Sequence, residues 1–463
     1  MRNGDVSFWW ADLGAVRPRP PLPGDLDADI AIVGGGLTGL WTAYYLRRSS
    51  PDARIAVFEQ RFCGFGASGR NGGWLSAEVA GNRSRYARIA RSRGQDGAAA
   101  NRQLTATMQA GVREVLARIH DEDIDCDAEH SGVLFLARCA AQRSRLAAHL
   151  DHEAEMGDTD WQLLSRSDLD TRLRVSAAQA GAWSPHCARV QPAKLSRGVA
   201  DAVERSGVEI YEQTRVADVD AGRVVTDRGT VRAPIVLVCV EGFTATLPRR
   251  HRSLLPLNSA MVVTEPLPDR VWDEIGWRDC ELLGEMAHAY TYSQRTADGR
   301  IALGGRGIPY RFGSAIDHDG VTQPPTATAL TTALRELFPA AADVPIAHTW
   351  CGVLGVHRDW SASIRYDPRT GMGSAAGYVG SGLTTTNVAA RTLHDLVLGH
   401  ETELTSLPWV GHRPRRWEPE PLRYLGVAGM YAAYRTADRR ELRGSSSRTD
   451  VVARIADRIS GRG

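Results

Sequence analysis

The sequence predicts an α/β fold from three features that follow one another between residues 29 and 59. The first is the apolar run Ile30–Val33, whose branched side chains are typical of a buried parallel strand. The second is a glycine-rich turn over 34–39, followed by apolar residues at helical spacing up to position 46. The third is a second strand-like run, 54–58, which is apolar from Ile55 onward and leads into Glu59. Strand, helix and strand in this order predict a Rossmann-like unit.

The glycine pattern indicates what this unit binds. Gly34 permits the tight turn, Gly36 lets the backbone approach a pyrophosphate, and Gly39 lets the helix pack closely on the strand. The N–H groups and positive dipole end of the helix then hold the diphosphate. Glu59 follows Gly39 by 20 residues, where a carboxylate accepts hydrogen bonds from a ribose. The predicted dinucleotide contacts here are Gly34, Gly36, Leu37, Thr38, Gly39, Glu59 and Gln60.

Length and composition set the limits for the rest of the chain. The 463 residues are enough for two domains or one large interleaved pair. A hydrophobic content of 43% and a charged content of 24% are typical of a soluble globular protein. The 56 basic and 54 acidic residues leave a formal net charge of +2, so no nucleic-acid or membrane-surface partner is predicted.

The cysteines and the apolar stretches indicate the compartment. Seven cysteines without a C-x-x-C pair favour a reduced, cytoplasmic protein over a disulfide framework or a zinc site, and we predict no metal. Residues 1–10 contain one arginine and no apolar core, so they are not expected to act as a secretory signal. No run approaches the roughly 18 to 20 apolar residues that a membrane span requires.

A second glycine-rich stretch, 64–74, makes the cofactor prediction more specific. Its five glycines, with Ser68, Arg70 and Asn71 between them, cannot form a core but can bring backbone donors close to a planar, anionic ligand. Combined with the pattern at 34–39, the stretch resembles the FAD-dependent amine and amino-acid oxidases of the D-amino-acid oxidase superfamily. Within that superfamily the sequence resembles the gamma-glutamylputrescine oxidase-like branch, over roughly residues 27–440.

The resemblance implies FAD as the cofactor and further contacts to it. In the family the second glycine stretch continues the pyrophosphate site and reaches the flavin ring, and a valine matching Val216 binds the adenine side through its backbone. A helix predicted over 383–398 can direct its first N–H groups at the pyrimidine edge of a flavin. Family members commonly have a histidine where this chain has Ser381, so only the backbone role carries over. The implied contacts are Ser68, Arg70, Asn71, Gly72, Gly73, Val216, Gly380, Ser381, Gly382, Leu383 and Thr384.

The predicted architecture is a Rossmann-like FAD-binding domain with an inserted α+β substrate domain built on an antiparallel sheet. Helical spacing and strand alternation change along the chain in a way that fits this interruption. The predicted boundaries are 1–24 for an N-terminal arm, 25–80, 185–256 and 355–400 for the FAD-binding domain, 81–184 and 257–354 for the substrate domain, and 401–463 for a C-terminal extension.

Local patterns place the remaining elements. Four prolines keep the part of the arm after Phe8-Trp9-Trp10 extended, and the aromatic part is expected to pack on the body of the protein or on a partner subunit. Residues 445–463 are expected to form a polar, partly mobile tail. The predicted helices are 97–119, 140–156, 195–206 and 422–441; the predicted strands are 132–136, 208–211, 214–219, 223–226, 235–240, 258–264, 288–294 and 300–304.

The strand predicted over 288–294 supplies the candidates for substrate contact. Its larger polar side chains fall on every second residue, so His288, Tyr290, Tyr292 and Gln294 share one face. Such a face suits a cavity wall, where tyrosine offers both packing area and a hydroxyl, and it equally suits a solvated sheet. We assign His288 and Gln294 to solvent, and Tyr290 and Tyr292 to the substrate pocket as candidate catalytic-site residues.

Two differences from the family pattern narrow the range of expected substrates. Sarcosine-oxidase-type relatives place a lysine near the flavin, and residues 300–305 contain none. Relatives that oxidise free amino acids grip the carboxylate with an arginine just after the segment matching 350–352, where this chain has apolar residues followed by His357 and Arg358. An amine or an N-substituted compound is therefore expected. Cys351 is expected to be a structural thiol, which makes the FAD non-covalent.

By resemblance, the function is FAD-dependent oxidation of an amine or amino-acid C–N bond to an imine, by hydride transfer to flavin N5. Oxygen or another electron carrier then reoxidises the flavin. Only one dinucleotide fingerprint is present, which favours electrons arriving from an organic substrate. Two readings stay open at this stage, an NAD-linked dehydrogenase and a non-catalytic flavin-binding protein. The oligomeric state is open too.

Overall fold

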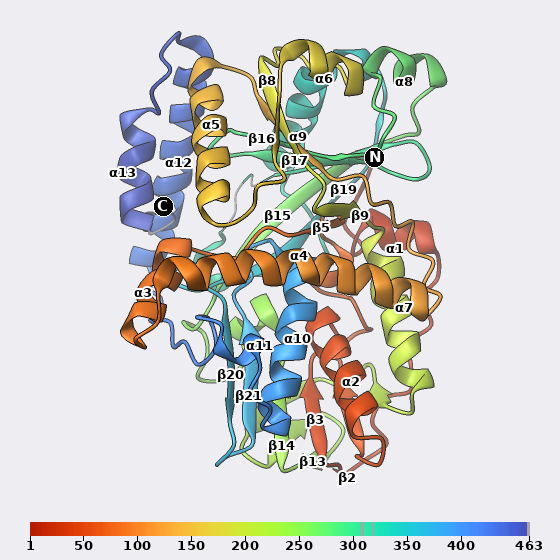
Figure 1. Cartoon of the computed structure of the whole chain (residues 1–463). Helices are drawn as coiled ribbons and strands as arrows, with labels where there is room; N and C mark the ends of the chain where they lie inside the picture. Colours follow the sequence, from red (N-terminus) through yellow and green to blue (C-terminus); the bar gives the residue numbers. More distant parts are fainter. Residues whose placement is uncertain (306, 308–309, 317–318, 461–463) are drawn as a thin grey trace.

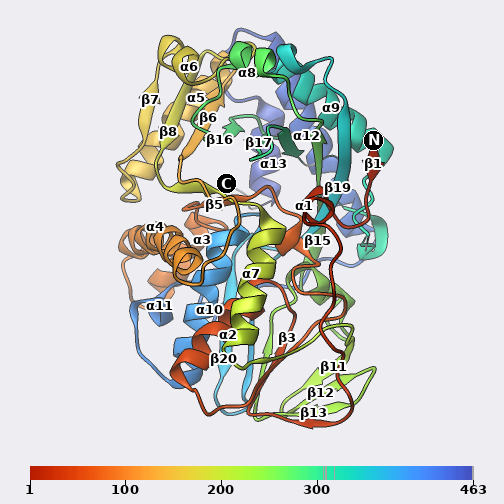
Figure 2. The same cartoon turned by 90° about the vertical axis from the view of Figure 1, so that its right-hand side faces the viewer.

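The computed structural model describes residues 1–305, 307, 310–316 and 319–460. The chain forms two lobes, a Rossmann-like lower lobe and an upper lobe around a long mixed sheet (Figure 1, Figure 2). Helix α4 (Gly97–Asp121) crosses the waist between them. This arrangement confirms the predicted α/β class with a Rossmann-like unit and a second sheet.

The lower lobe is built around the strand that precedes the first glycine turn. β3 (Ile30–Val33) is buried along its whole length and pairs in parallel with β4 (Ile55–Phe58) on one side and β14 (Ile235–Val238) on the other. Helix α2 (Leu37–Ser49) follows the turn and packs against α10 (Gly382–Leu398) and α7 (Pro192–Arg205). The sheet order is β10 (Glu209–Tyr211), β4, β3, β14, β21 (Met372–Ala376), β20 (Ser363–Asp367).

The upper lobe carries the longest strands. β15 (Leu255–Thr264) is buried throughout and pairs antiparallel with β19 (Ile346–Val356) and β18 (Ile301–Gly305). Two of its neighbour pairs are parallel, β1 with β19 and β16 with β6, so the sheet is mixed. Its order is β1 (Arg2–Asn3), β19, β15, β18, β17 (Thr291–Arg295), β16 (Leu282–Glu285), β6 (Val133–Ala137), β8 (Ala180–Ser184), β7 (Gln162–Leu164).

Smaller elements complete both lobes. A side sheet of the lower lobe has the order β11 (Val216–Asp220), β12 (Arg223–Thr226), β13 (Thr230–Arg232), β2 (Leu26–Asp27), and β5 (Trp74–Ser76) pairs with β9 (Cys187–Arg189). The other helices are α1 (Phe8–Leu13), α3 (Arg83–Ser92), α5 (Ala140–Glu155), α6 (Arg166–Arg172), α8 (Asp269–Ile275), α9 (Pro324–Leu337), α11 (Glu403–Ser406), α12 (Leu422–Arg443) and α13 (Val451–Ser460).

Three segments differ from expectation. The tail is not simply a polar, mobile stretch, because residues 451–460 form α13 and its Ala453 is buried against α12. The strand expected over 288–294 begins only at Thr291, because residues 288–289 form a turn. Helix α4 lies in the range expected for the substrate domain, yet its apolar side packs into the core of the lower lobe with β3 and α10.

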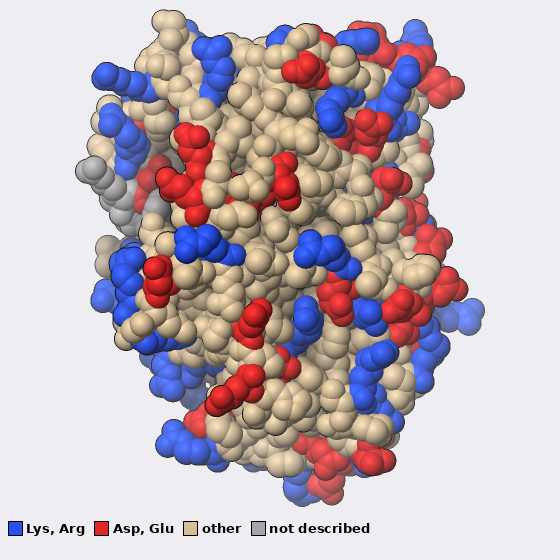
Figure 3. All heavy atoms as spheres, viewed as in Figure 1, with Lys and Arg blue, Asp and Glu red and all other residues tan. Residues whose placement is uncertain are grey.

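The molecular surface shows no concentration of one charge over the face in Figure 3, where basic and acidic side chains are interspersed. Among the helices of the described residues, none combines the length and the apolar composition that crossing a bilayer requires.

Candidate functional site

One large cavity of about 840 Å³ joins the two lobes. Its wall is formed by the carboxyl ends of β3, β4 and β14, where ligands bind in open α/β sheets, and by strands of the upper sheet. Residues from the first and second glycine stretches and from the start of α10 face the same space. The cavity therefore has the size and the two-lobed wall of a site for a large cofactor together with a small molecule.

The first glycine turn has the geometry that its spacing predicts. Gly34 has a φ of +108°, and a Cβ there would lie 2.6 Å from the Cys239 carbonyl oxygen. A Cβ at Gly36 would lie 3.1 Å from the Ser68 hydroxyl, and a Cβ at Gly39 would collide with the Gly34 carbonyl. Gly39 thus serves helix–strand packing and lies behind the cavity wall. The space beside Gly36 fits a diphosphate held on backbone N–H groups.

Glu59 lies at the end of β4 and lines the cavity with Gln60. Its carboxylate accepts hydrogen bonds from the N–H of Gly35 at 2.9 Å and of Arg61 at 3.0 Å. Burial raises its pKa, and these backbone bonds oppose that rise. The carboxylate therefore holds the glycine turn in place, and its predicted bond to a ribose stays a prediction.

The second glycine stretch uses its polar side chains to fold itself. The buried guanidinium of Arg70 donates to the Phe65 carbonyl at 2.7 Å and stacks over the Phe65 ring at 4.4 Å. The Asn71 side chain donates to the Ser68 carbonyl at 2.8 Å and accepts from the Gly73 N–H at 2.8 Å. A Cβ at Gly73 would collide with the Val190 carbonyl, so this glycine lies behind the loop. The loop consequently presents mainly backbone to the cavity.

The third segment is the start of α10. Gly380 has a φ of +114°, and no side chain caps the helix, so its first N–H groups face the cavity beside Gly382 and Leu383. The Ser381 hydroxyl donates to Glu78 Oε2 at 3.0 Å. Thr384 is buried inside the lobe and does not line the cavity. This helix terminus fits a partly anionic ring edge.

Most of the residues singled out in the sequence meet at this one cavity. Gly39, Gly73 and Thr384 are outside its lining for the packing reasons given above. The lining contains Gly34, Gly36, Leu37, Thr38, Glu59, Gln60, Ser68, Arg70, Asn71, Gly72, Val216, Gly380, Ser381, Gly382, Leu383, Tyr290 and Tyr292.

The two tyrosines reach the cavity by different routes. Tyr292 lies in β17, packs its ring over Gly72 and Gly304, and shares a hydrogen bond with the Ser259 hydroxyl at 2.9 Å. Tyr290 precedes the strand, so the two-residue alternation does not explain its position. Trp74 meets the Tyr292 ring edge-on at 6.1 Å between centroids. The upper wall is thus aromatic with hydroxyl groups at intervals.

The assignment of His288 and Gln294 to solvent is wrong. Gln294 is buried, and its side-chain amide donates to the Gly72 carbonyl at 2.6 Å, which ties β17 to the second glycine stretch. The His288 side chain is 7% exposed, because α12 covers it. The covering helix lies more than a hundred residues further along the chain, so alternation within one strand could not reveal it.

Several ionisable residues of the lining escaped sequence reasoning. Glu241 follows β14, and the rule that ligands bind at the carboxyl ends of parallel strands could have indicated it. Burial raises the pKa of Glu241 to about 7. The N–H groups of Gly377 and Tyr378 both donate to one of its carboxylate oxygens, Oε1, at 3.1 and 2.9 Å. The others come from helices, loops and the end of β16, and they have no local motif. They include Glu78, Arg145, His149, Glu285 and Asp457.

His357 and Arg358, the candidates for replacing the arginine that binds a substrate carboxylate in relatives, do not reach the cavity. Arg358 pairs with Glu418 at 2.9 Å and stacks on Trp417, and His357 bonds the Ser361 carbonyl at 2.7 Å. Neither lines the cavity. The Cys351 thiol, also outside the lining, donates to the Val321 carbonyl at 3.4 Å.

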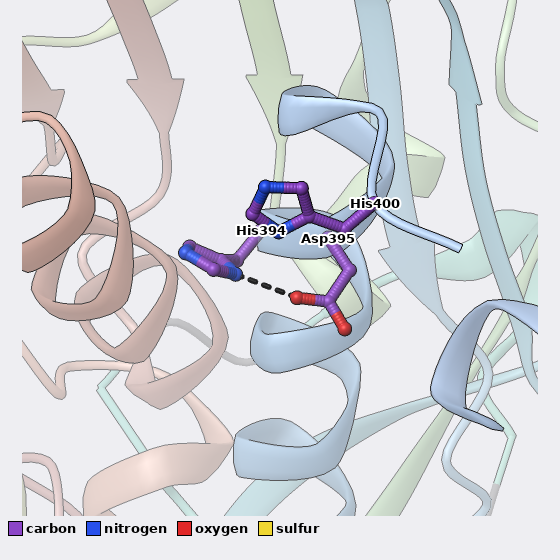
Figure 4. Close-up of side chains that lie close together, drawn as sticks. All are labelled: His394, Asp395 and His400. Carbon is purple, nitrogen blue, oxygen red and sulfur yellow. Dashed lines mark hydrogen bonds and ion pairs between the residues drawn. The ribbon is translucent and has the colours of Figure 1, made fainter. Parts of the chain in front are cut away.

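Within the part of the chain that the structure describes, three groups of histidine and carboxylate side chains have ligand atoms close enough to hold a metal ion, and one of them is drawn in Figure 4. There His394 contacts Asp395 at 2.8 Å, and its other nitrogen bonds the Ser49 hydroxyl at 2.7 Å. The second oxygen of Asp395 accepts from Thr402 at 2.7 Å. Because the ligand atoms of His394 and Asp395 already have protein partners, these two residues are accounted for by a hydrogen-bond network.

A Rossmann-like lobe, a second mixed sheet and a shared cavity define a dinucleotide-dependent enzyme. The family model described as DAO, FAD dependent oxidoreductase, matches residues 29–396. The chain belongs to this family, and it is an FAD-dependent oxidoreductase. The matched stretch contains all three cavity segments described above, and the NAD-linked reading finds no support.

Named relatives agree with this assignment. The chain is 28% identical over 427 residues to gamma-glutamylputrescine oxidoreductase of Escherichia coli K12, covering 89% of this chain and 94% of the relative. It is 24% identical to glycine oxidase of Geobacillus kaustophilus, covering 82% and 96% of the two chains. The crystal structure of glycine oxidase from that organism superimposes with a TM-score of 0.67 at 22% identity, covering 84% and 100% of the two chains.

Proposed function

We propose that the protein oxidises the C–N bond of a small amine to an imine, with FAD bound between the two lobes. The observation that carries this proposal is one continuous cavity whose lining runs from the glycine turns to Tyr290 and Tyr292. When bound, FAD supplies the redox chemistry by accepting a hydride from the carbon next to the amine nitrogen. The relatives named above include proteins titled for amine and amino-acid oxidation, which supports the same reaction class.

The proposed role of the chain is to place and orient the two molecules. Backbone N–H groups at the start of α2, other than that of Leu37, which already donates to the Ser68 hydroxyl, would hold the diphosphate, and those at the start of α10 would hold the ring edge of FAD. Tyr292, Trp74 and Phe135 would form the apolar wall against the substrate. Such positioning is the main contribution that a protein makes to a cofactor's reaction.

An amine is favoured over a free amino acid because of how Arg145 is used. Among the described residues that line the cavity from the upper lobe, the one arginine is Arg145. Its guanidinium pairs with the Glu441 carboxylate at 2.8 Å. Its Nε donates to the Met286 carbonyl at 2.9 Å. The ion pair with Glu441 neutralises the guanidinium charge and so weakens its attraction for a second carboxylate, while its Nη1 has no hydrogen-bond partner among the described residues. The apolar Val353 and Leu354 occupy the wall where the family arginine is expected.

Three finer features complete the proposal. The FAD is non-covalent, because the thiol of Cys351 lies outside the cavity lining. The electron acceptor is oxygen or another carrier. The protein works in the reducing cytoplasm, in keeping with seven free cysteines and no disulfide among the described residues.

The test is anaerobic mixing of purified protein with a panel of amines and amino acids while the flavin absorbance is followed. We expect primary or N-substituted amines to bleach the flavin and free amino acids to leave it unchanged. Admitting air afterwards, with and without an artificial carrier, identifies the acceptor. If no compound bleaches the flavin, the protein is a flavin-binding protein without this activity and the proposal fails.

A further inference from the structure

Helices α12 and α13 lie beyond residue 396, where the match to the family model ends. Together they form a C-terminal helical hairpin that packs against α5 at the side of the upper lobe (Figure 1). Asp457 of α13 lines the cavity, as do Arg145, His288 and Tyr290, which lie on or next to the elements that the hairpin covers. A segment beyond the end of the family-model match therefore forms part of the cavity wall.

Asp438 of α12 holds the turn that leads into β17. One of its carboxylate oxygens accepts from the N–H of His288 at 2.8 Å, and the other accepts from the N–H of Ala289 at 2.9 Å. A carboxylate that accepts two backbone N–H groups forms charge-assisted bonds, which are about twice as strong as neutral ones. The turn ends at Tyr290, so Asp438 determines where that side chain enters the cavity.

Glu441 lies one turn further along the same face of α12 and is 6% exposed. It pairs with Arg145 at 2.8 Å and with the His288 ring nitrogen at 3.1 Å, and it accepts from the Asp450 N–H at 2.8 Å. Burial alone would raise the pKa of Glu441, but His288 and Arg145 lower it to about 2. The carboxylate is therefore ionised at neutral pH. Through its contacts with Arg145, His288 and Asp450 it links α5, the turn at 288–289 and the two helices of the hairpin.

Tyr434 completes the contact. Its ring stacks on His288 at 5.9 Å between centroids with an interplanar angle of 9°, and its hydroxyl donates to Asp457 at 2.8 Å. The segment 286–290 is thus held by one carboxylate on its backbone, one on its histidine and one aromatic ring. All three come from α12.

We propose that the C-terminal hairpin is a substrate-specificity element, in which Asp438 and Glu441 are positioning residues that hold segment 286–290 and Arg145 against the substrate. This inference rests on the proposed function, because it assigns the hairpin to the substrate end of that site. Asp457 of the hairpin, and the segment 286–290 that α12 holds, form one part of the cavity wall. The hairpin therefore sets how long a substrate can be.

The experiment compares Asp438→Asn and Glu441→Gln with wild type, as purified full-length protein loaded with FAD. Arg439→Gln is the matched control, since Arg439 is exposed on the outer side of the same helix. The readouts are FAD content, melting temperature, and the steady-state constants for unbranched primary amines of increasing length. The Kd of each amine, read from the perturbation of the flavin spectrum, gives a measure independent of turnover.

We expect both variants to raise KM and Kd for the longer amines about tenfold, the change that follows from losing roughly 1.4 kcal/mol of a charge-assisted bond. Turnover at saturation and FAD content should stay within about twofold of wild type, and the control should match wild type throughout. Wild-type KM and Kd in both variants would overturn the proposal. The proposal would also be overturned if affinity fell equally for short and long amines and in proportion to a fall in melting temperature. That result would mark a purely structural role. If no amine reduces the wild-type flavin, the proposed function has failed, and the hairpin proposal fails with it.

Discussion

Trp9 donates its indole N–H to the backbone carbonyl of Asn71 at 2.8 Å. This bond joins α1, near the start of the chain, to the second glycine stretch, and Ser7 adds another to the Gly69 carbonyl at 2.8 Å. Trp9 is buried and packs edge-on against Trp350 at 5.7 Å between centroids. The N-terminal segment is thus a support for the cofactor loop on the body of its own chain.

Trp9→Phe should weaken FAD binding. The change keeps an aromatic ring but removes the donor to Asn71, a loss of about 0.5 to 1.5 kcal/mol, so Kd for FAD should rise roughly 2- to 12-fold. Trp10→Phe is the matched control, because the indole nitrogen of Trp10 has no hydrogen-bond partner among the described residues. Fluorescence titration of flavin-free protein with FAD measures both. Equal Kd values in the two variants would contradict the supporting role.

Gly36→Val should yield folded but colourless protein. The branched side chain would extend beside the Ser68 hydroxyl into the space predicted for the pyrophosphate. The wild type should be yellow, with the two visible flavin bands. Gly24→Val, at a position where a Cβ meets nothing within 4 Å, is the control and should stay yellow. A folded Gly36→Val protein with a full complement of FAD would refute the assignment of this turn.

Acid precipitation should release the flavin into the supernatant. The Cys351 thiol is buried, donates to the Val321 carbonyl and lies outside the cavity lining, so it is badly placed to form a bond to FAD. Absorbance of pellet and supernatant decides the matter. Flavin that remains with the pellet, and is lost in Cys351→Ser, would show covalent attachment.

Tyr292→Phe and Tyr290→Phe should change kinetics more than stability. Loss of one uncharged hydroxyl bond is worth about 0.5 to 1.5 kcal/mol, so a roughly 2- to 12-fold fall in kcat/KM is expected. FAD content and melting temperature should stay close to wild type, because both residues are only partly buried at the cavity. Wild-type kinetics in both variants would remove the tyrosines from the substrate site. A parallel loss of stability would make them structural.

Glu241 should make stability depend on pH. Burial raises its folded-state pKa to about 7, above the value in the unfolded chain, so the native state holds the proton more tightly. Stability from this group is therefore full at low pH and falls as the pH rises from about 4.5 to 7, by at most roughly 3 kcal/mol. Glu241→Gln should flatten that slope in denaturant unfolding of flavin-free protein between pH 5 and 8. Glu401→Gln, an exposed site, should leave the slope unchanged.

How much the sequence predicts depends on how local the signal is. The turn at 34–39 and the loop at 64–74 are encoded by glycines whose backbone conformations are set within a few residues, so their place at one cavity could be predicted. Tyr290 reaches the same cavity because Asp438 holds the turn before it, a contact spanning about 150 residues. Arg145 and Asp457 enter from helices that have no motif. Such groups are placed by tertiary packing alone, which a pattern along one strand does not encode.

The pairing of β1 with β19 has a consequence for how the protein is made. Arg2 and Asn3 lie in register with His348 and Thr349, so this short strand cannot pair until those two distant residues have been synthesised. The central strand β3 likewise needs β14, about two hundred residues later. Such long-range pairings slow folding and leave apolar strand edges uncovered during synthesis. An N-terminal fragment that ends before residue 346 should therefore aggregate, and newly made chains should depend on chaperones until β19 has emerged.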